Sequence, residues 1–217
     1  ENKSVKNLSN TFWLNHLFFT DMEKENRSRP LLFHRWGGLG NHRYQIGFSG
    51  DTHSTWDALD FQSTFTATAA NVGYGYWSHD IGGHMGDDND PELYLRWIQF
   101  GVFSPILRTH CTKSKDIERR MFMYPKQFST MHDALQMRYA LNPYIYNAAR
   151  LAYDSGISIC RPMYYDYPES EWAYTYSHQY FFGNDMIVAP VGSKAENDLS
   201  LKKFWLPQGE WFELYTG

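Results

Sequence analysis

The chain has 217 residues, enough for one large domain with a buried core, so a small scaffold held together by disulfides is excluded. Hydrophobic residues make up 42% and charged residues 20% of the chain, and with a formal net charge of -4 this composition disfavours both intrinsic disorder and a nucleic-acid partner. No run approaches about 18 consecutive apolar residues, so a membrane is not expected as a partner either.

Short apolar runs alternate with helical patterns in the first half of the chain. Four such runs, bounded by glycine or polar residues, predict buried strands at residues 29–36, 44–51, 73–83 and 104–110. After the second run, apolar residues from Trp56 onward and an alanine-rich end predict a helix. Asp90 as N-cap and Pro91 at the first helical position predict another.

The second half begins with a helical pattern over residues 125–154, in which Pro143 predicts a break or kink and Gly156 the end. Two further strands are predicted at residues 159–165 and 185–191. From about Leu201 the pattern changes to two aromatic strands across a Pro-Gln-Gly turn. We therefore expect a separate β domain to begin over residues 193–217.

Buried strands separated by helices predict an α/β fold with a parallel sheet. Ionisable residues follow four consecutive strands: Arg35, Asp51, Asp80 and His110. A (β/α)8 barrel assembles its chemistry at that end of its strands. A doubly wound sheet is the alternative, but GGLG at residues 37–40 lacks the glycine spacing that this fold usually carries after its first strand.

Asp51 taken alone is most simply an N-cap of the following helix. Capping does not explain all four groups, because it needs neither an arginine nor a histidine. Hydrolysis of a bond between sugars needs two carboxyl groups, and a nearby Arg and His can hold hydroxyls and stabilise charge. Aromatic residues, 18% of the chain, also suit a sugar, although a large aromatic core explains them equally well.

One segment could suggest a metal site, since it gathers His79, Asp80, His84, Asp87, Asp88 and Asp90. It has neither the zinc His-Glu spacing nor the EF-hand loop, and Cys111 and Cys160 also lack metal-ligand spacing. We prefer a polar active-site loop here, and expect no metal. The cysteines do not identify a cellular compartment.

Five segments in order along nearly the whole chain resemble glycoside hydrolase family 31, the retaining α-glycosidases: HRWGGLGNHRYQIGFSGDTHSTWDAL, NVGYGYWSHDIGGHMG, LRWIQFGVFSPILRTH, ICRPMYYDYP and FFGNDMIVAPV. The resemblance implies the C-terminal half of that family's catalytic (β/α)8 TIM barrel over residues 1–192, followed by the start of a β-sandwich domain over residues 193–217. It also implies hydrolysis of terminal α-linked sugars, most closely of α-glucosidase type, without a cofactor.

The resemblance assigns roles to the four ionisable residues. Asp51, in the GD motif, corresponds to the general acid/base, and Arg35, sixteen residues earlier, to the arginine that contacts the sugar. Asp80 of the DIGG motif and His110 of the R-x-H motif correspond to residues that hold the sugar.

Three further positions are candidates for sugar contact. Phe48 stands where many members place a tryptophan, and His84 replaces a frequent aromatic residue, so the identity of the sugar stays open. Trp77 is a candidate pocket-wall residue.

The family's nucleophile, an aspartate in a W-x-D motif, has no counterpart here. Residues 11–19 resemble the segment that comes after this motif in one bacterial subgroup, which implies a nucleophile just upstream of Glu1. The chain is thus expected to be an inactive fragment in which Asp51 titrates nearer an ordinary aspartate than in the intact enzyme. Its open strand edges are expected to need the upstream half of the barrel, or self-association.

Two alternative hypotheses remain. The aromatic surface could belong to a noncatalytic carbohydrate-binding module, or Asp51 and Asp80 could themselves be the acid and base pair.

Overall fold

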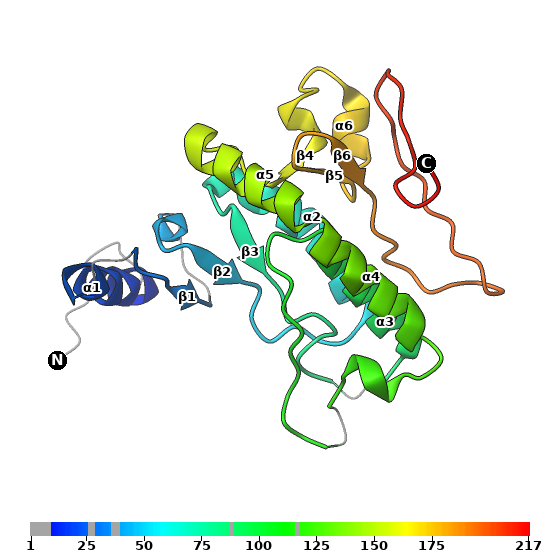
Figure 1. The fold of residues 1–217 in the computed structure, drawn as a ribbon, viewed down its shortest axis with the longest axis horizontal. Helices are drawn as coiled ribbons and strands as arrows, with labels where there is room; N and C mark the ends of the chain where they lie inside the picture. The colour runs from blue at the N-terminus through cyan, green and yellow to red at the C-terminus, as the bar shows by residue number, and fades with distance from the viewer. Residues whose placement is uncertain (1–9, 26–28, 36–39, 87–88, 116–117) are drawn as a thin grey trace.

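The computed structural model describes residues 10–25, 29–35, 40–86, 89–115 and 118–217 (Figure 1). Three parallel strands form the first sheet, in the order β1 (Phe33–His34), β2 (Ile46–Phe48) and β3 (Tyr76–Ser78). Residues 106–109 continue it through parallel bridges from Ile106 to Ser78 and from Thr109 to Ile81. The four strand positions predicted in the first half are therefore adjacent and parallel. Most of the GGLG segment lies outside the described residues.

Helices connect and cover these strands. The α-helices are α1 (Asn10–Glu25), α2 (Trp56–Thr68), α3 (Pro91–Val102), α4 (Phe128–Ala140), α5 (Asn142–Ser155) and α6 (Glu171–Thr175). Short 3-10 helices among the described residues are η1 (Asn41–Arg43), η2 (Ala69–Val72), η3 (Met121–Met123) and η4 (Met163–Tyr165). In Figure 1, α4 and α5 form a long rod alongside the sheet, and α1 and the C-terminal end lie on opposite sides of the molecule. Among the described residues, none of the helices combines the length and the apolar character that crossing a bilayer requires.

Helix ends largely follow the sequence. The Asp90 carboxylate accepts hydrogen bonds from the first-turn N–H groups of α3, which confirms the predicted cap. Gly156, at φ +76°, ends α5 as predicted. The predicted break before Pro143 separates α4 from α5. The N-cap of α2 is Thr55, whose hydroxyl accepts from the backbone of the first turn, so the capping alternative for Asp51 is wrong.

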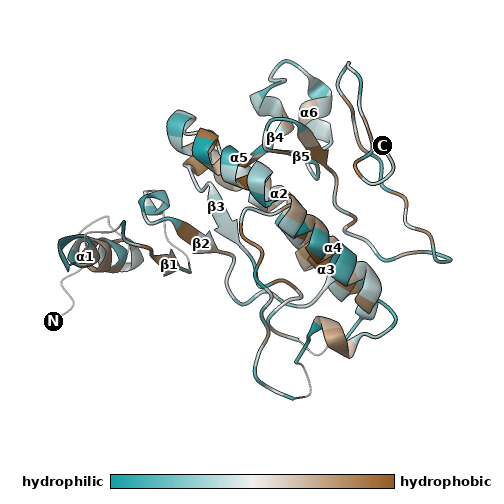
Figure 2. Ribbon diagram, in the orientation of Figure 1, coloured by the Kyte–Doolittle hydropathy of each residue, from teal (hydrophilic) through white to brown (hydrophobic). Residues whose placement is uncertain are grey.

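Among the described residues, the larger of two core clusters lies where α2, α3 and α4 meet the strands, and the smaller one surrounds Met163, Ala173 and Phe181. The fully buried side chains of the larger cluster include Leu59, Ile81, Trp97, Phe100 and Tyr180. Burial of each such side chain contributes about 1.5–3 kcal/mol. Figure 2 shows hydrophobic residues along β1 and β2, as expected for strands of a barrel wall.

The second half of the chain differs from two predictions, one for its sheet and one for its C-terminal tail. The sheet is antiparallel, in the order β4 (Cys160–Pro162), β5 (Tyr180–Phe182) and β6 (Met186–Val188). The strands predicted at 159–165 and 185–191 exist, but they flank an unpredicted strand and do not extend the parallel sheet. The aromatic strands predicted after Leu201 are wrong, because residues 201–217 form no strand. Leu201 and Phe212 are 93% and 82% exposed, whereas Trp205 packs edge-on against Tyr167 and exchanges two hydrogen bonds with Gln179, so only part of this tail is packed.

Candidate active site

Five predicted site residues form one cluster at the carboxyl ends of the parallel strands. The Arg35 guanidinium pairs with Asp51 Oδ1. His84 lies between the two carboxylates, with Nε2 4.0 Å from Asp51 Oδ1 and Nδ1 3.5 Å from Asp80 Oδ2. The ring of His84 stacks on that of His110, with centroids 4.9 Å apart. The cluster therefore presents two carboxylates, a guanidinium and two imidazoles in one place.

The loop that carries His84 is fixed by backbone contacts to the loop that carries Asp51. The carbonyl of Thr52 accepts hydrogen bonds from the N–H groups of His84 and Met85, at 2.7 and 3.0 Å. Gly83 has φ +80°, and a Cβ on it would lie 2.5 Å from the Cα of Ser54. Only glycine therefore allows the two loops to approach this closely.

Asp80 is fully buried, and its Oδ1 pairs with the Arg108 guanidinium. A buried carboxylate needs such a partner, because desolvation of an unpaired charge is costly. The Arg108 guanidinium also lies over the rings of Phe48 and Phe33, 4.9 and 5.2 Å from their centroids. Sequence reasoning missed Arg108. The signal was the alternation of side chains along an extended segment, which puts Arg108 on the same face as His110.

The two aromatic candidates differ in position. Phe48 is half-buried and also lies beside Arg35, whose guanidinium is 6.0 Å from the ring centroid, so it borders the cluster. The buried ring of Trp77 packs edge-on against Phe65 of α2 and against Tyr74, at 5.2 and 5.1 Å. Trp77 thus lies in the layer between the sheet and α2. The structure brings Phe48 to the cluster and does not bring Trp77 there.

The ion pair controls the protonation of Asp51. Its hydrogen bond with Arg35 is the main cause that lowers the pKa of the Asp51 carboxyl, and the charges of Arg35, His84 and His110 act in the same direction against a partial desolvation. Asp51 is therefore ionised at neutral pH in this arrangement. The sequence predicts a pKa nearer that of an ordinary aspartate than in the intact enzyme, and the contacts of Asp51 lower its pKa below the ordinary value.

His79, next to Asp80 in sequence, has a structural role. Its Nε2 lies 2.5 Å from the Thr66 hydroxyl of α2, and its Nδ1 lies 3.2 Å from the Ser49 hydroxyl just after β2. Complete burial lowers the pKa of His79 to about 3. The neutral ring therefore ties α2 to the strand ends that carry the cluster.

Among the described residues, Asp80, His84 and His110 could offer metal ligands, since their ligand atoms lie within 4.8 Å of one another. Tetrahedral zinc ligands lie only about 3.3 Å apart. The carboxylate of Asp80 is also already paired with Arg108. Asp87 and Asp88 lie outside the described residues, and the absence of a metal stays a prediction.

Two family descriptions match consecutive parts of the chain. "Glycosyl hydrolases family 31 TIM-barrel domain" matches residues 1–148, and "Glycosyl hydrolase family 31 C-terminal domain" matches residues 156–217. The second match begins just before β4, whereas the aromatic pattern places the start of the β domain at residue 193.

Curated relatives and solved structures agree with these matches. The isomaltosyltransferase of Sporosarcina globispora is 30% identical, and the match covers 92% of this chain and 19% of that protein. The α-xylosidase of Emericella nidulans is 32% identical, and the match covers 84% of this chain and 22% of that protein. A Flavobacterium johnsoniae family 31 dextranase complexed with glucose superposes with a TM-score of 0.84 and 29% identity, covering 94% of this chain and 26% of that one. A soil-metagenome family 31 α-xylosidase complexed with xylose superposes with a TM-score of 0.76 and 30% identity, covering 84% of this chain and 30% of that one. The chain spans about a fifth of the length of these curated relatives. It belongs to glycoside hydrolase family 31, and consists of part of the family's TIM barrel followed by a small antiparallel sheet of its C-terminal domain.

Proposed function

We propose that this chain forms the later part of the catalytic barrel of a retaining α-glycosidase, with Asp51 as the general acid/base. The observation that carries the proposal is the cluster of Arg35, Asp51, Asp80, His84 and His110 at the carboxyl ends of parallel strands. That edge is where barrels of this kind assemble their active sites. The substrate is a terminal α-linked sugar of an oligosaccharide or glycoside. Relatives named α-xylosidase and α-glucosidase make xylose and glucose the first sugars to test.

In the proposed mechanism, Asp51 first donates a proton to the oxygen of the leaving group. It then accepts a proton from the water that hydrolyses the covalent glycosyl intermediate. Arg35, Asp80 and His110 hold the hydroxyl groups of the sugar. Asp80 is buried and paired with Arg108, and a carboxylate held in this way can accept charge-assisted hydrogen bonds.

The nucleophile of the pair is assigned to a segment that precedes this chain, because the chain has no W-x-D motif. The carboxyl groups of a retaining pair lie about 5–5.5 Å apart. A unit charge at that distance contributes about 3 kcal/mol at an effective dielectric constant of about 20, or about two pKa units. This repulsion raises the pKa of Asp51, which the acid role requires.

Replacement of Asp51 in the longer protein that carries both carboxylates tests this role. Asp51→Ala is expected to lower kcat/KM for an α-linked disaccharide by about 10³-fold, because the leaving oxygen must be protonated. For an α-glycosyl fluoride kcat/KM falls far less, because fluoride leaves without strong acid assistance, whereas kcat falls because hydrolysis of the intermediate loses its general base. Added azide restores turnover of the fluoride and forms a glycosyl azide of retained configuration. Steady-state kinetics and product NMR measure these effects.

Two variants serve as comparisons. Asp57→Ala changes an exposed aspartate in the first turn of α2 and is expected to leave the kinetics unchanged. Asp80→Ala is expected mainly to raise KM. If Asp80→Ala instead abolishes turnover with every substrate while Asp51→Ala only weakens binding, the role of Asp51 is refuted. Sugar binding without turnover by the unaltered longer protein would identify a binding module instead.

A further inference from the structure

Arg119 is a buried arginine outside the cluster that contacts the loop of His84. Only 4% of its surface is exposed. Its Nη2 donates a hydrogen bond to the carbonyl of Gly83 at 2.8 Å, and its Nη1 donates to the carbonyl of Gly86 at 3.1 Å. The planar guanidinium of Arg119 therefore bridges the backbone from Gly83 to Gly86, the stretch that carries the side chain of His84.

This loop needs external support. Gly82, Gly83 and Gly86 all have left-handed φ values, of +100°, +80° and +90°. Glycine loses more conformational entropy than other residues when it is ordered. A glycine-rich loop therefore needs contacts with the rest of the protein to stay in one conformation. The backbone of Thr52 supplies two of those contacts on one side, and Arg119 supplies two more.

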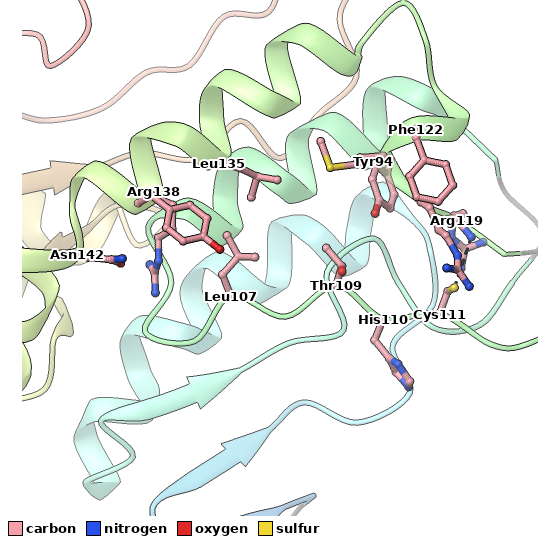
Figure 3. Close-up of a pocket in the computed structure, with 13 residues that line it drawn as sticks. Tyr94, Leu107, Thr109, His110, Cys111, Arg119, Phe122, Leu135, Arg138 and Asn142 are labelled. Carbon is pink, nitrogen blue, oxygen red and sulfur yellow. Dashed lines mark hydrogen bonds between the residues drawn. The ribbon is translucent and has the colours of Figure 1, made fainter.

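Arg119 also contacts the segment that carries the second imidazole. Its backbone N–H lies 3.5 Å from the Sγ of Cys111, the residue directly after His110. In Figure 3, Arg119 lies beside Cys111, and His110 points away from them on the preceding stretch. The same residue thus touches both of the segments whose histidine rings stack on each other.

We propose that Arg119 is a positioning residue that holds His84 against Asp51 and Asp80 and keeps the His84 ring stacked on the ring of His110. The kinetic consequence rests on the proposed glycosidase function, whereas the placement of His84 does not. The role requires arginine, because its rigid fork of donors reaches two carbonyls at once. A lysine keeps the charge but presents a single ammonium.

Arg119→Lys in the longer protein tests the proposal, with Arg120→Lys as the matched control. Arg120 is the next residue, but it is exposed and pairs with Glu118. Arg119→Lys is expected to lower kcat/KM about tenfold, since small displacements of a site residue have effects of that size or larger, and Arg120→Lys to change it less than twofold. In a His84→Ala background, Arg119→Lys is expected to lower kcat/KM less than twofold, because Arg119 acts through His84.

A second readout does not depend on activity. With histidine labelled at ring carbon, the His84 resonance is expected to shift in Arg119→Lys and to stay in place in Arg120→Lys. If the unaltered protein hydrolyses no α-glycoside, the proposed function fails and this resonance alone decides the role of Arg119.

Several results overturn the positioning role while leaving the function intact. These are an unmoved His84 resonance, an equal loss of kcat/KM with and without His84, or no loss at all. If Arg119→Lys does not fold, Arg119→Gln replaces it in the same cycle, since its amide retains one donor group. If neither folds while Arg120→Lys does, Arg119 has a structural role only.

Discussion

Arg35 and Asp51 form an ion pair whose side chains are 39% and 37% exposed, and the pair sets the charge of the site. Arg35→Gln is expected to raise the pKa of Asp51 toward the ordinary aspartate value, since the hydrogen bond from Arg35 is the main cause that lowers it. Because the pKa is lowered in the folded state, the stabilisation by this pair is present above the unfolded-state pKa of about 3.9 and is lost as pH falls through the lower folded value.

A titration of the Asp51 carboxyl carbon by NMR, with and without Arg35→Gln, measures this shift. Identical midpoints would show that Arg35 is not the cause. An Asp51 carboxyl still protonated at pH 6 in the unaltered chain would contradict both the structure and the sequence prediction.

Much of the cluster could be predicted at the scale of single residues. Arg35, Asp51, Asp80 and His110 follow consecutive strands, and parallel strands bring such residues to one edge. Alternation along the fourth strand places Arg108 on the same face as His110, but its pairing with Asp80 depends on the burial of Asp80, which is set by tertiary packing. The position of Trp77 depends on which face of β3 meets α2, and this is set by tertiary packing.

At the scale of elements, two left-handed glycines allow a controlled comparison. Gly83 and Gly156 have φ values of +80° and +76°. A Cβ at Gly156 would meet no atom within 4 Å, whereas one at Gly83 would clash with the backbone of Ser54. Gly156→Ala is therefore expected to destabilise by about 1–2 kcal/mol from the backbone conformation alone. Gly83→Ala adds an overpacking cost of about 1–3 kcal/mol.

Urea denaturation followed by circular dichroism measures both variants. Equal losses of unfolding free energy would contradict the close approach of the two loops.

Elements with local end signals were predictable. Asp90 with Pro91 begins α3, and Gly156 ends α5, because caps and glycine act within one turn. Strand direction has no comparable signal, since a three-residue apolar strand has the same sequence in a parallel and an antiparallel sheet. This is why β4 and β6 were expected to be parallel. Helix α1 was missed because its apolar residues are spread over more than one face: Leu14 and Phe18 are 51% and 61% exposed, whereas Phe12 and Phe19 pack against Tyr44.

At the scale of the whole molecule, the parallel sheet has an open side. β1 is its outermost strand among the described residues, and Leu31 and Phe33 at this edge are 67% and 44% exposed. Unpaired strand edges with apolar side chains promote pairing with other chains. The isolated chain is therefore expected to associate, with a mass by light scattering above its own 25.5 kDa.

Leu31→Lys is expected to reduce this association, because a charge at an edge disfavours pairing. Leu151→Lys, at an exposed leucine of α5, is the matched control and is expected to leave the mass unchanged. A stable monomer of the unaltered chain would contradict the expectation.

The double use of the Thr52 carbonyl also affects protein engineering. Because it accepts from His84 and Met85, and the Ser54 N–H donates to Met85 in return, the loops after β2 and β3 interlock through main-chain atoms. Replacement of either loop alone by that of a relative is therefore expected to break these main-chain hydrogen bonds. A chimera retains its geometry only when both loops are exchanged together, as one inherited unit.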